Sequence, residues 1–386
     1  MTAPQLKAVF VGHTAAPSGA ELATLRLLRA MRSLDGAPNV EPSVILTEGG
    51  PMVEQLRACG IPTSVVDNGF DSRSVTIGGS GWLRRLGGVL ALVRIGWVLG
   101  AMLKARRADI VVAGSVKALV MSAVGAARAR IPLVWYVHDR VSREYFGGPT
   151  AFLIRWFAWA VCDGFLANSG STATTVRGRP TRIAYPGVVE RAIDCRRPGR
   201  VASDTVISVV GRLTPWKGQD VFLRALARAE ARPRQVYLVG GTFFDEEPYR
   251  TYLEALAREL RLPVTFTGHV DDPTEILCES DILVHCSVIA EPFGQVVVEG
   301  LQAGCAVIAT RPGGPAEIIE PDHSGLLVEA GDVAGLTGAL DRLMADPSLR
   351  TRLTQAGRLR AQRFGIADSA RTVADFLSDV VGERRA

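Results

Sequence analysis

The stretch DILVHCSVIAEPFGQVVVEGLQAGCAVIATR, residues 281–311, decides the fold. It opens with a short apolar run, 281–287, and continues through a loop that contains Pro292. Apolar residues with helical spacing follow and end at Gly304, and a second β-rich run begins at 306. This order predicts two parallel strands joined by a crossover helix, which is the basic unit of α/β proteins.

The same alternation extends in both directions along the chain. In the C-terminal half, further strands are expected at 205–213, 235–241 and 263–268. In the N-terminal half they are expected at 6–12, 43–50, 62–67, 108–114 and 131–139. β-Branched strands that alternate with helices predict a parallel sheet covered on both faces. The sequence therefore predicts an α/β protein of two doubly wound, Rossmann-like domains that face a cleft.

The length of 386 residues also fits two domains. A segment rich in Pro, Gly and Arg, 185–204, marks the divide between them. We expect an N-terminal domain at 1–190, a linker at 191–204 and a C-terminal domain at 205–365. We expect a last helix, 366–386, to pack back toward the N-terminal domain.

Charge and cysteine content exclude several classes of protein. The net charge is +5 and the basic residues are dispersed or interleaved with apolar helix, so the sequence does not support a nucleic-acid role. Six cysteines are scattered without CxxC spacing, which indicates neither a zinc site nor a redox motif. The first apolar run is too short for a signal peptide, and we expect a cytoplasmic protein.

Two glutamates, Glu291 and Glu299, flank the expected start of the helix in 291–304. The backbone N–H groups between them are those of Phe293, Gly294, Gln295 and Val296. A helix start of this kind favours an anion such as a diphosphate, and carboxylates accept hydrogen bonds from sugar hydroxyls. A nucleotide sugar carries hydroxyls on both sides of its diphosphate, so the spacing fits that ligand class.

Other interpretations of the two acids stay open. Glu299 could be a helix residue on a polar face, although its neighbours are apolar, and Glu291 could be a turn residue before a proline. A pair of glycosidase carboxylates is a third interpretation, although the sequence shows no aromatic cleft for a sugar.

Two cations follow the expected strand 205–213. Arg212 stands at its end and Lys217 just before the next helix, where a guanidinium and an ammonium would suit a diphosphate. The alternative is that both are solvated surface charges. Gly19, in the loop after strand 6–12, precedes a helix start that would also suit an anion. The GxGxxG and GxxxxGK[ST] patterns are absent, so this loop taken alone indicates only a turn.

These residues match a known family. The chain resembles the family 4 retaining glycosyltransferases of the two-domain GT-B fold, over nearly its whole length and most closely at 205–330. The most specific match is E-P-F-G-x4-E, the E-x7-E motif of the family, at Glu291 and Glu299. Supporting matches are GRLTPWKGQD at 211–220, GHV at 268–270, GGPAEII at 313–319, SGLLVEAGD at 324–332, SGAE at 18–21 and VHD at 137–139.

The resemblance implies a role for each matched residue. Glu299 would bind the ribose hydroxyls of the donor, and Glu291 the hydroxyls of the transferred sugar near the reacting carbon. Arg212 and Lys217 would neutralise the diphosphate, and His138 would line the sugar site from the opposite domain. The other implied donor contacts are the backbone at Phe293, Gly294, Gln295 and Val296, the nucleobase contact of Val270, and the close approach of the loop at Gly19. Gln295 departs from the family, where an apolar residue is common.

The implied activity is transfer of a sugar, with retention of configuration, from a nucleotide-diphosphate sugar to a lipid-linked, glycan or small-molecule acceptor. Fixed cations and helix amides can stabilise the leaving diphosphate. No Asp-x-Asp stands at a strand end, so we expect no metal and no cofactor. Alternatives are a nucleotide-sugar epimerase or hydrolase on the same fold, or a non-catalytic, membrane-associated protein that binds nucleotide sugars.

Residues 82–107 are apolar and basic. From Ser72 to Ala108 the chain has seven basic residues and no acid. Three interpretations stay open: a membrane-spanning helix, which the central Arg94 disfavours; a helix buried before strand 108–114; and a helix whose basic ends and Trp97 rest on anionic lipid. The run 151–162 either joins this face or packs in the core. The third interpretation predicts a peripheral protein on the inner face of the plasma membrane, with a role in cell-envelope or glycan biosynthesis.

Overall fold

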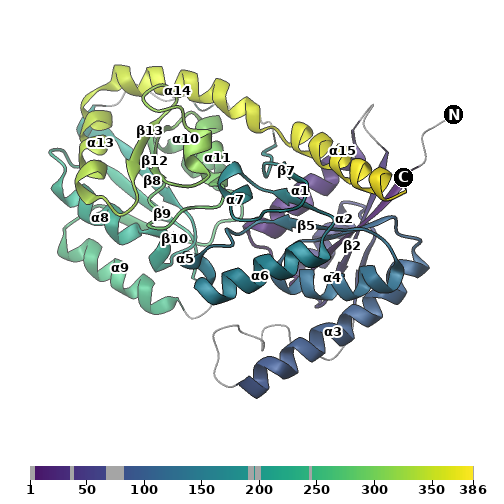
Figure 1. Ribbon diagram of the computed structural model, residues 1–386. Helices are drawn as coiled ribbons and strands as arrows, with labels where there is room; N and C mark the ends of the chain where they lie inside the picture. The colour runs from purple at the N-terminus through teal and green to yellow at the C-terminus, as the bar shows by residue number, and fades with distance from the viewer. Residues whose placement is uncertain are drawn as a thin grey trace. The chain divides into compact units, whose positions relative to one another are not determined.

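The computed structural model describes residues 5–34, 39–66, 82–189, 195, 201–242 and 246–385 (Figure 1). For residues 82–86 and 385 it describes the backbone alone. The chain forms two compact units: unit 1 comprises Met1–Val189 with Ile366–Ala386, and unit 2 comprises Glu190–Gly365. Of the linker expected at 191–204, residues 191–194 and 196–200 lie outside the described residues.

Unit 1 contains a parallel sheet of seven strands in the order β3-β2-β1-β4-β5-β6-β7. The strands are β1 (Leu6–Gly12), β2 (Val40–Leu46), β3 (Thr63–Val65), β4 (Ile110–Ala113), β5 (Leu133–Val137), β6 (Gly164–Ala167) and β7 (Thr181–Ile183). In the middle of the sheet Phe10 aligns with Val44 on one side and Val112 on the other. All residues of β4 and β5 are buried, as expected of strands covered on both faces.

Helices cover both faces of this sheet (Figure 1). One face packs against α1 (Gly19–Arg32), α2 (Pro51–Ala58) and α15 (Ile366–Arg385). The other packs against α3 (Trp82–Ala105), α4 (Val116–Ala129) and α6 (Gly148–Val161). The described part of unit 1 also contains two short helices, α5 (Arg143–Phe146) and α7 (Gly170–Ala173). α15 lies against α1 and buries Val373, Phe376 and Leu377, so the end of the chain belongs to the core of unit 1.

Unit 2 repeats the architecture with six parallel strands in the order β10-β9-β8-β11-β12-β13. They are β8 (Val206–Val210), β9 (Gln235–Val239), β10 (Val264–Gly268), β11 (Ile282–Val284), β12 (Ala306–Arg311) and β13 (Leu326–Glu329). On one face α8 (Gln219–Arg228) packs with α9 (Glu247–Glu259) and α13 (Val333–Ala345). On the other, α11 (Gln295–Ala303) packs with α10 (Thr274–Glu279) and α14 (Pro347–Ala361); α12 (Pro315–Ile318) is short. Cys195 and Cys278 form a disulfide that sequence spacing did not indicate, since they lie 83 residues apart.

The prediction of two doubly wound domains is confirmed. Three strands were not predicted. β6 follows the apolar helix α6 after only Cys162 and Asp163, so a single polar residue separates the two elements. β7 has three exposed residues at a sheet edge, and β13 lies in a segment dominated by turns. In both sheets the strand order reverses direction beside the first strand, between β1 and β4 and between β8 and β11. Ligands of open α/β sheets bind at the carboxyl ends of such strand pairs.

Helix α3 is neither wholly buried nor wholly exposed. Leu92, Leu99 and Leu103 are buried in the core, whereas Leu90 and Trp97 are 68% and 59% exposed. Its stretch Gly87–Ala105 is long and apolar enough to cross a membrane, and 39% of that stretch is buried. The expectation of a helix buried before β4 thus holds for one stripe only.

Gly218 offers a test of how tightly the loops beyond β8 and β11 fit together. It has φ +70°, and a Cβ there would lie 2.2 Å from the carbonyl oxygen of Cys286. Gly218→Ala should therefore lower the free energy of unfolding of unit 2 by about 2 kcal/mol or more, seen as a lower urea midpoint. Gly338→Ala, in helix α13 where a Cβ meets nothing, is the control and should stabilise by about 0.5–1 kcal/mol. Equal midpoints for the two variants would contradict this account.

Candidate functional site

The candidate site of unit 2 lies where the strand order reverses. Lys217 follows β8, and Glu291 follows β11 in the loop that leads to α11. The Lys217 Nζ is 2.6 Å from the Glu291 Oε2, and their side chains are only 19% and 12% exposed. The structure thus brings together the cation and the acid that the sequence placed at these two strand ends.

A single carboxylate oxygen of Glu291 accepts all the hydrogen bonds that its side chain receives from described residues. Its Oε2 accepts from Lys217 and, at 2.9 Å, from the Ser287 hydroxyl, and it lies 3.3 Å from the His285 Nε2. Burial alone would raise the pKa of Glu291, but the charge of Lys217 and the hydrogen bonds from His285 and Lys217 outweigh it and hold that pKa far below its usual value. Glu291 is therefore ionised, with its position fixed through Oε2 and with Oε1 left to accept from a ligand.

The backbone of Glu291 is fixed as well. It forms a bridge with Gly313, and its carbonyl oxygen accepts a 2.8 Å hydrogen bond from the Gly314 N–H. A Cβ at Gly314 would lie 2.4 Å from backbone atoms of Phe293, so only glycine lets the loops beyond β11 and β12 approach this closely. Thr310, in β12, holds the neighbouring residues of Glu291. Its Oγ1 lies 3.3 Å from the His285 Nδ1 and donates a 2.9 Å hydrogen bond to the Ser287 carbonyl oxygen.

Helix α11 begins beside Glu291. Its N-cap, Gly294, has φ +94°, and the N–H groups of Gln295 and Val296 have no hydrogen-bond acceptor among the described residues. The Gln295 side chain donates a 2.8 Å hydrogen bond to the Glu299 Oε1, one turn further along. Gln295, a departure from the family pattern, thus orients the second glutamate of the motif.

The remaining predicted residues of unit 2 have different surroundings. The Arg212 Nε lies 3.4 Å from a carboxylate oxygen of Glu246, so this cation has an acidic partner of its own. Val270 is half-buried two residues beyond β10. The Phe293 side chain is buried against the ring of Phe364, 5.9 Å away, which leaves only its backbone to face a ligand.

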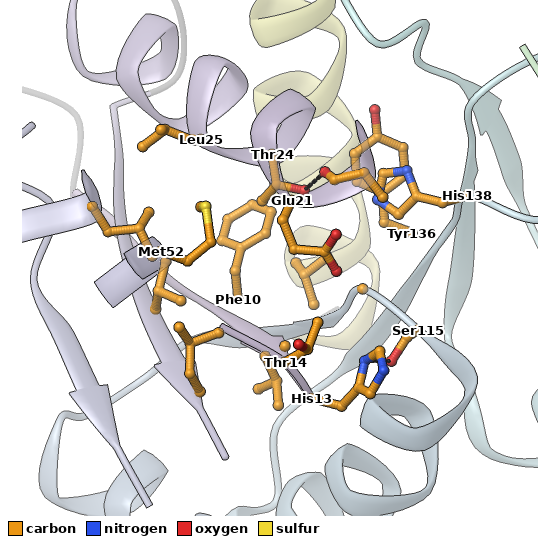
Figure 2. Close-up of a pocket in the computed structure, with 18 residues that line it drawn as sticks. Phe10, His13, Thr14, Glu21, Thr24, Leu25, Met52, Ser115, Tyr136 and His138 are labelled. Atoms are coloured by element: carbon orange, nitrogen blue, oxygen red, sulfur yellow. Dashed lines mark hydrogen bonds between the residues drawn. The ribbon is translucent and has the colours of Figure 1, made fainter. Parts of the chain in front are cut away.

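Unit 1 has a pocket at the carboxyl ends of β1 and β4, where the strand order of its sheet reverses. Figure 2 shows Glu21 extending into it from α1, with His13, Ser115 and His138 at the carboxyl ends of β1, β4 and β5. The far wall is apolar and includes Leu25 and Met52. Gly19 does not line this pocket; it is the exposed first residue of α1.

Two histidines in this pocket are held neutral. Burial lowers the pKa of His138 to about 4, and burial with the nearby charge of Lys117 does the same for His13. The His13 Nδ1 is 2.9 Å from the Ser115 hydroxyl, whereas the His138 Nε2 is enclosed without a hydrogen-bond partner among the described residues. Burial also raises the pKa of Glu21. The pocket therefore carries little positive charge and offers one unsatisfied imidazole nitrogen.

Sequence reasoning did not select His285, Ser287 and Thr310, although they surround Glu291. His285 and Ser287 belong to the strand end HCS at 285–287, and polar residues at the carboxyl end of a buried strand are a usable signal. His13 and Ser115, also at strand ends, gave the same unused signal in unit 1.

A double-mutant cycle should measure the coupling energy between Lys217 and Glu291. Lys217→Met leaves the Glu291 carboxylate without its cation and should destabilise unit 2 by about 3 kcal/mol, whereas adding Glu291→Gln should recover much of that loss. The matched control is Arg311→Met with Glu329→Gln, a pair 2.7 Å apart but more than half exposed. Its coupling energy from urea unfolding should stay below about 1 kcal/mol. Additive effects at Lys217 and Glu291 would show that the buried pair is not coupled.

Two family models match the chain. The model described as Glycosyl transferases group 1 matches residues 192–360, and the model described as Glycosyltransferase Family 4 matches residues 17–197. The first match lies within unit 2, and the second covers most of the N-terminal part of unit 1.

Relatives and a solved structure agree with these matches. The chain is 31% identical over 217 residues to D-inositol 3-phosphate glycosyltransferase of Acidothermus cellulolyticus, an alignment covering 54% of this chain and 48% of that protein. It is 33% identical over 214 residues to the lipopolysaccharide core biosynthesis glycosyltransferase LpsE of Rhizobium meliloti, covering 46% and 61%. The chain thus spans about half the length of the curated relatives it matches.

The fold also resembles a solved protein structure over nearly the whole chain. Anabaena HepE in complex with UDP and glucose has a TM-score of 0.79 and 26% identity, with 97% of this chain and 100% of that chain covered. The similarity therefore extends over both of the Rossmann-like units described above. Together with the family matches in both units, this similarity leads to one conclusion. The chain belongs to family 4 of the glycosyltransferases, with the GT-B fold.

Proposed function

We propose that this protein is a retaining glycosyltransferase that transfers a sugar from a nucleoside-diphosphate sugar to a lipid-linked, glycan or small-molecule acceptor. One observation carries the proposal. An ionised, nearly buried Glu291 with an open carboxylate oxygen lies beside a helix start with two unused N–H groups. Such an arrangement can hold a sugar and a diphosphate side by side.

The donor would lie along the loop and first turn of α11. Its diphosphate would accept from the amides of Gln295 and Val296, and its ribose would donate to Glu299, which Gln295 orients. The transferred sugar would donate to the Glu291 Oε1. The crystallised complex of HepE with UDP and glucose supports this ligand class. Val270, two residues beyond β10, would meet the nucleobase.

The chemistry requires positive charge at the leaving group. Breaking the bond between the anomeric carbon and the diphosphate oxygen develops positive charge on the sugar and negative charge on the diphosphate. The Lys217 ammonium has three N–H donors, and Glu291 takes one of them, so the others can bind phosphate oxygens. Arg212 would exchange Glu246 for the diphosphate. These cations and the helix amides make a metal ion unnecessary in this proposal.

Retention follows if the acceptor attacks from the face that the diphosphate leaves. The new bond between the acceptor oxygen and the anomeric carbon forms as the old one breaks, and a phosphate oxygen takes the acceptor proton. A water-poor site prevents hydrolysis of the donor. In unit 1, the neutral His138 would donate to or accept from a sugar hydroxyl through its unsatisfied Nε2 without adding charge.

We also propose a peripheral location on an anionic membrane through 82–107. The exposed apolar stripe of α3, with Leu90 and Trp97, supports it, and so does the relative LpsE, whose name places it in lipopolysaccharide core biosynthesis. The other stripe of α3 belongs to the core of unit 1, which favours a helix that lies on a membrane over one that spans it.

Nucleoside diphosphates test the donor site. We expect UDP, among UDP, GDP and ADP, to raise the melting temperature most, because HepE binds UDP. Glu299→Gln should weaken the binding of the stabilising nucleotide about tenfold, by about 1.4 kcal/mol, as measured by titration calorimetry. Glu275→Gln, an exposed glutamate of α10 in the same unit, should bind as the wild type does. If no nucleotide stabilises the protein, the proposed donor class is wrong.

Transfer itself tests the chemistry. With UDP-glucose as donor and a panel of lipid and soluble acceptors, Lys217→Ala should lower kcat about 100-fold or more, since one preorganised donor contributes about 3 kcal/mol. EDTA should leave the rate unchanged, and proton NMR should show a product with the anomeric configuration of the donor. An inverted product would rule out retention, and a rate that needs added divalent ion would rule out metal independence. Equal turnover without acceptor would indicate a hydrolase or epimerase instead.

A further inference from the structure

Helix α6 carries an apolar, aromatic outer face that the site does not use. Phe152, Leu153, Trp156 and Trp159 are 48–61% exposed, whereas Ile154 and Ala158 face the core. A surface helix of a globular domain normally presents polar residues to water. Clustered exposed apolar side chains of this size indicate a surface that contacts something else.

The helix lies on the same face of the sheet as α3. Both pack with α4 against one core, and α3 adds five exposed apolar side chains: Val89, Leu90, Val93, Trp97 and Val98. Neither α3 nor α6 contains an Asp or Glu. The acid that follows α6, Asp163, is paired with Arg384. The face is thus apolar and positively charged.

A hollow of about 420 Å³ lies along α6. It is lined by Phe152, Arg155, Trp156, Trp159, Thr174, Thr175 and Arg177. Arg155 and Arg177 are exposed, and neither has an acidic partner among the described residues. A guanidinium group can donate two hydrogen bonds to the oxygens of one phosphate. Indole rings favour the boundary between lipid headgroups and acyl chains. Arg179 lies over the Trp159 ring at 5.9 Å and adds a third positive charge.

We propose that α6 and this hollow bind the headgroup region of an anionic phospholipid bilayer, with Arg155 and Arg177 on lipid phosphates and Phe152 and Trp156 in the interface. The inference rests on the membrane part of the proposed function and gives it a second contact and a headgroup site. A bilayer accounts for both properties of the face: its charge attracts the arginines, and its apolar boundary accepts the aromatic rings. A second copy of the chain that packed the same face against this one would place Arg155 and Arg177 near their like-charged counterparts.

Vesicle sedimentation tests the inference. Wild-type protein should bind vesicles of phosphatidylcholine with about one third phosphatidylglycerol at low salt, and should bind pure phosphatidylcholine weakly. Arg155→Glu with Arg177→Glu should lower the apparent partition coefficient about tenfold or more. The control, Arg258→Glu with Arg352→Glu, makes the same change in net charge on exposed residues of unit 2 and should bind like the wild type. Phe152→Ser with Trp156→Ser should also bind weakly, whereas Leu359→Ser, equally exposed on α14, should not change binding.

The outcomes separate this inference from the donor site. Variants of α6 that lose vesicle binding but keep stabilisation by UDP support it, because their fold and donor site are intact. Equal binding by the two arginine double variants would overturn it, as would competition by soluble glycerol phosphate, which would indicate a small phosphate ligand. A dimer in sedimentation velocity that Phe152→Ser with Trp156→Ser dissociates would assign the face to a second copy. Vesicle binding without any response to nucleotides would leave this inference standing and remove the proposed donor.

Discussion

A lysine ammonium and a glutamate carboxylate, both nearly removed from water, join the loops beyond β8 and β11. Removing such charges from water is costly, so each requires the other, and the surrounding polar groups must be placed to match. Ser287 and His285 supply those groups, and glycine in the next loop permits the close approach. The loops beyond β8 and β11 therefore have the geometry that a nearly buried, ionised carboxylate requires.

That constraint supports the proposed binding of a nucleotide sugar. A carboxylate held through one oxygen has a fixed second oxygen, which is what recognition of sugar hydroxyls needs. Glu299 is oriented in the same way by Gln295. In each case a neighbouring side chain occupies one oxygen of the acid, so that a ligand meets an oriented group instead of a mobile one.

Much of the fold was predictable, because β-branched runs between helical patterns predict parallel strands and the pattern recurs in both halves. The strands that were missed have weak sequence patterns. Only Cys162 and Asp163 separate β6 from the apolar helix α6, and β7 is exposed at a sheet edge. In the candidate site, the sequence pointed to Glu291 and Lys217 because each follows a predicted strand, and to Glu299 because it lies in the helix that follows Glu291. It did not point to Thr310, since its contact with His285 joins residues 25 apart and depends on side-chain geometry that spacing does not encode.

Unit 1 is assembled from two distant parts of the chain, since α15 supplies Val373, Phe376 and Leu377 to a core whose strands all come from residues before 190. During synthesis, the strands of the first sheet are made long before α15. Until then one side of the first sheet lacks part of its apolar cover and is open to aggregation or chaperones. Shortening α15 should therefore affect solubility during expression more than the finished chemistry of unit 2.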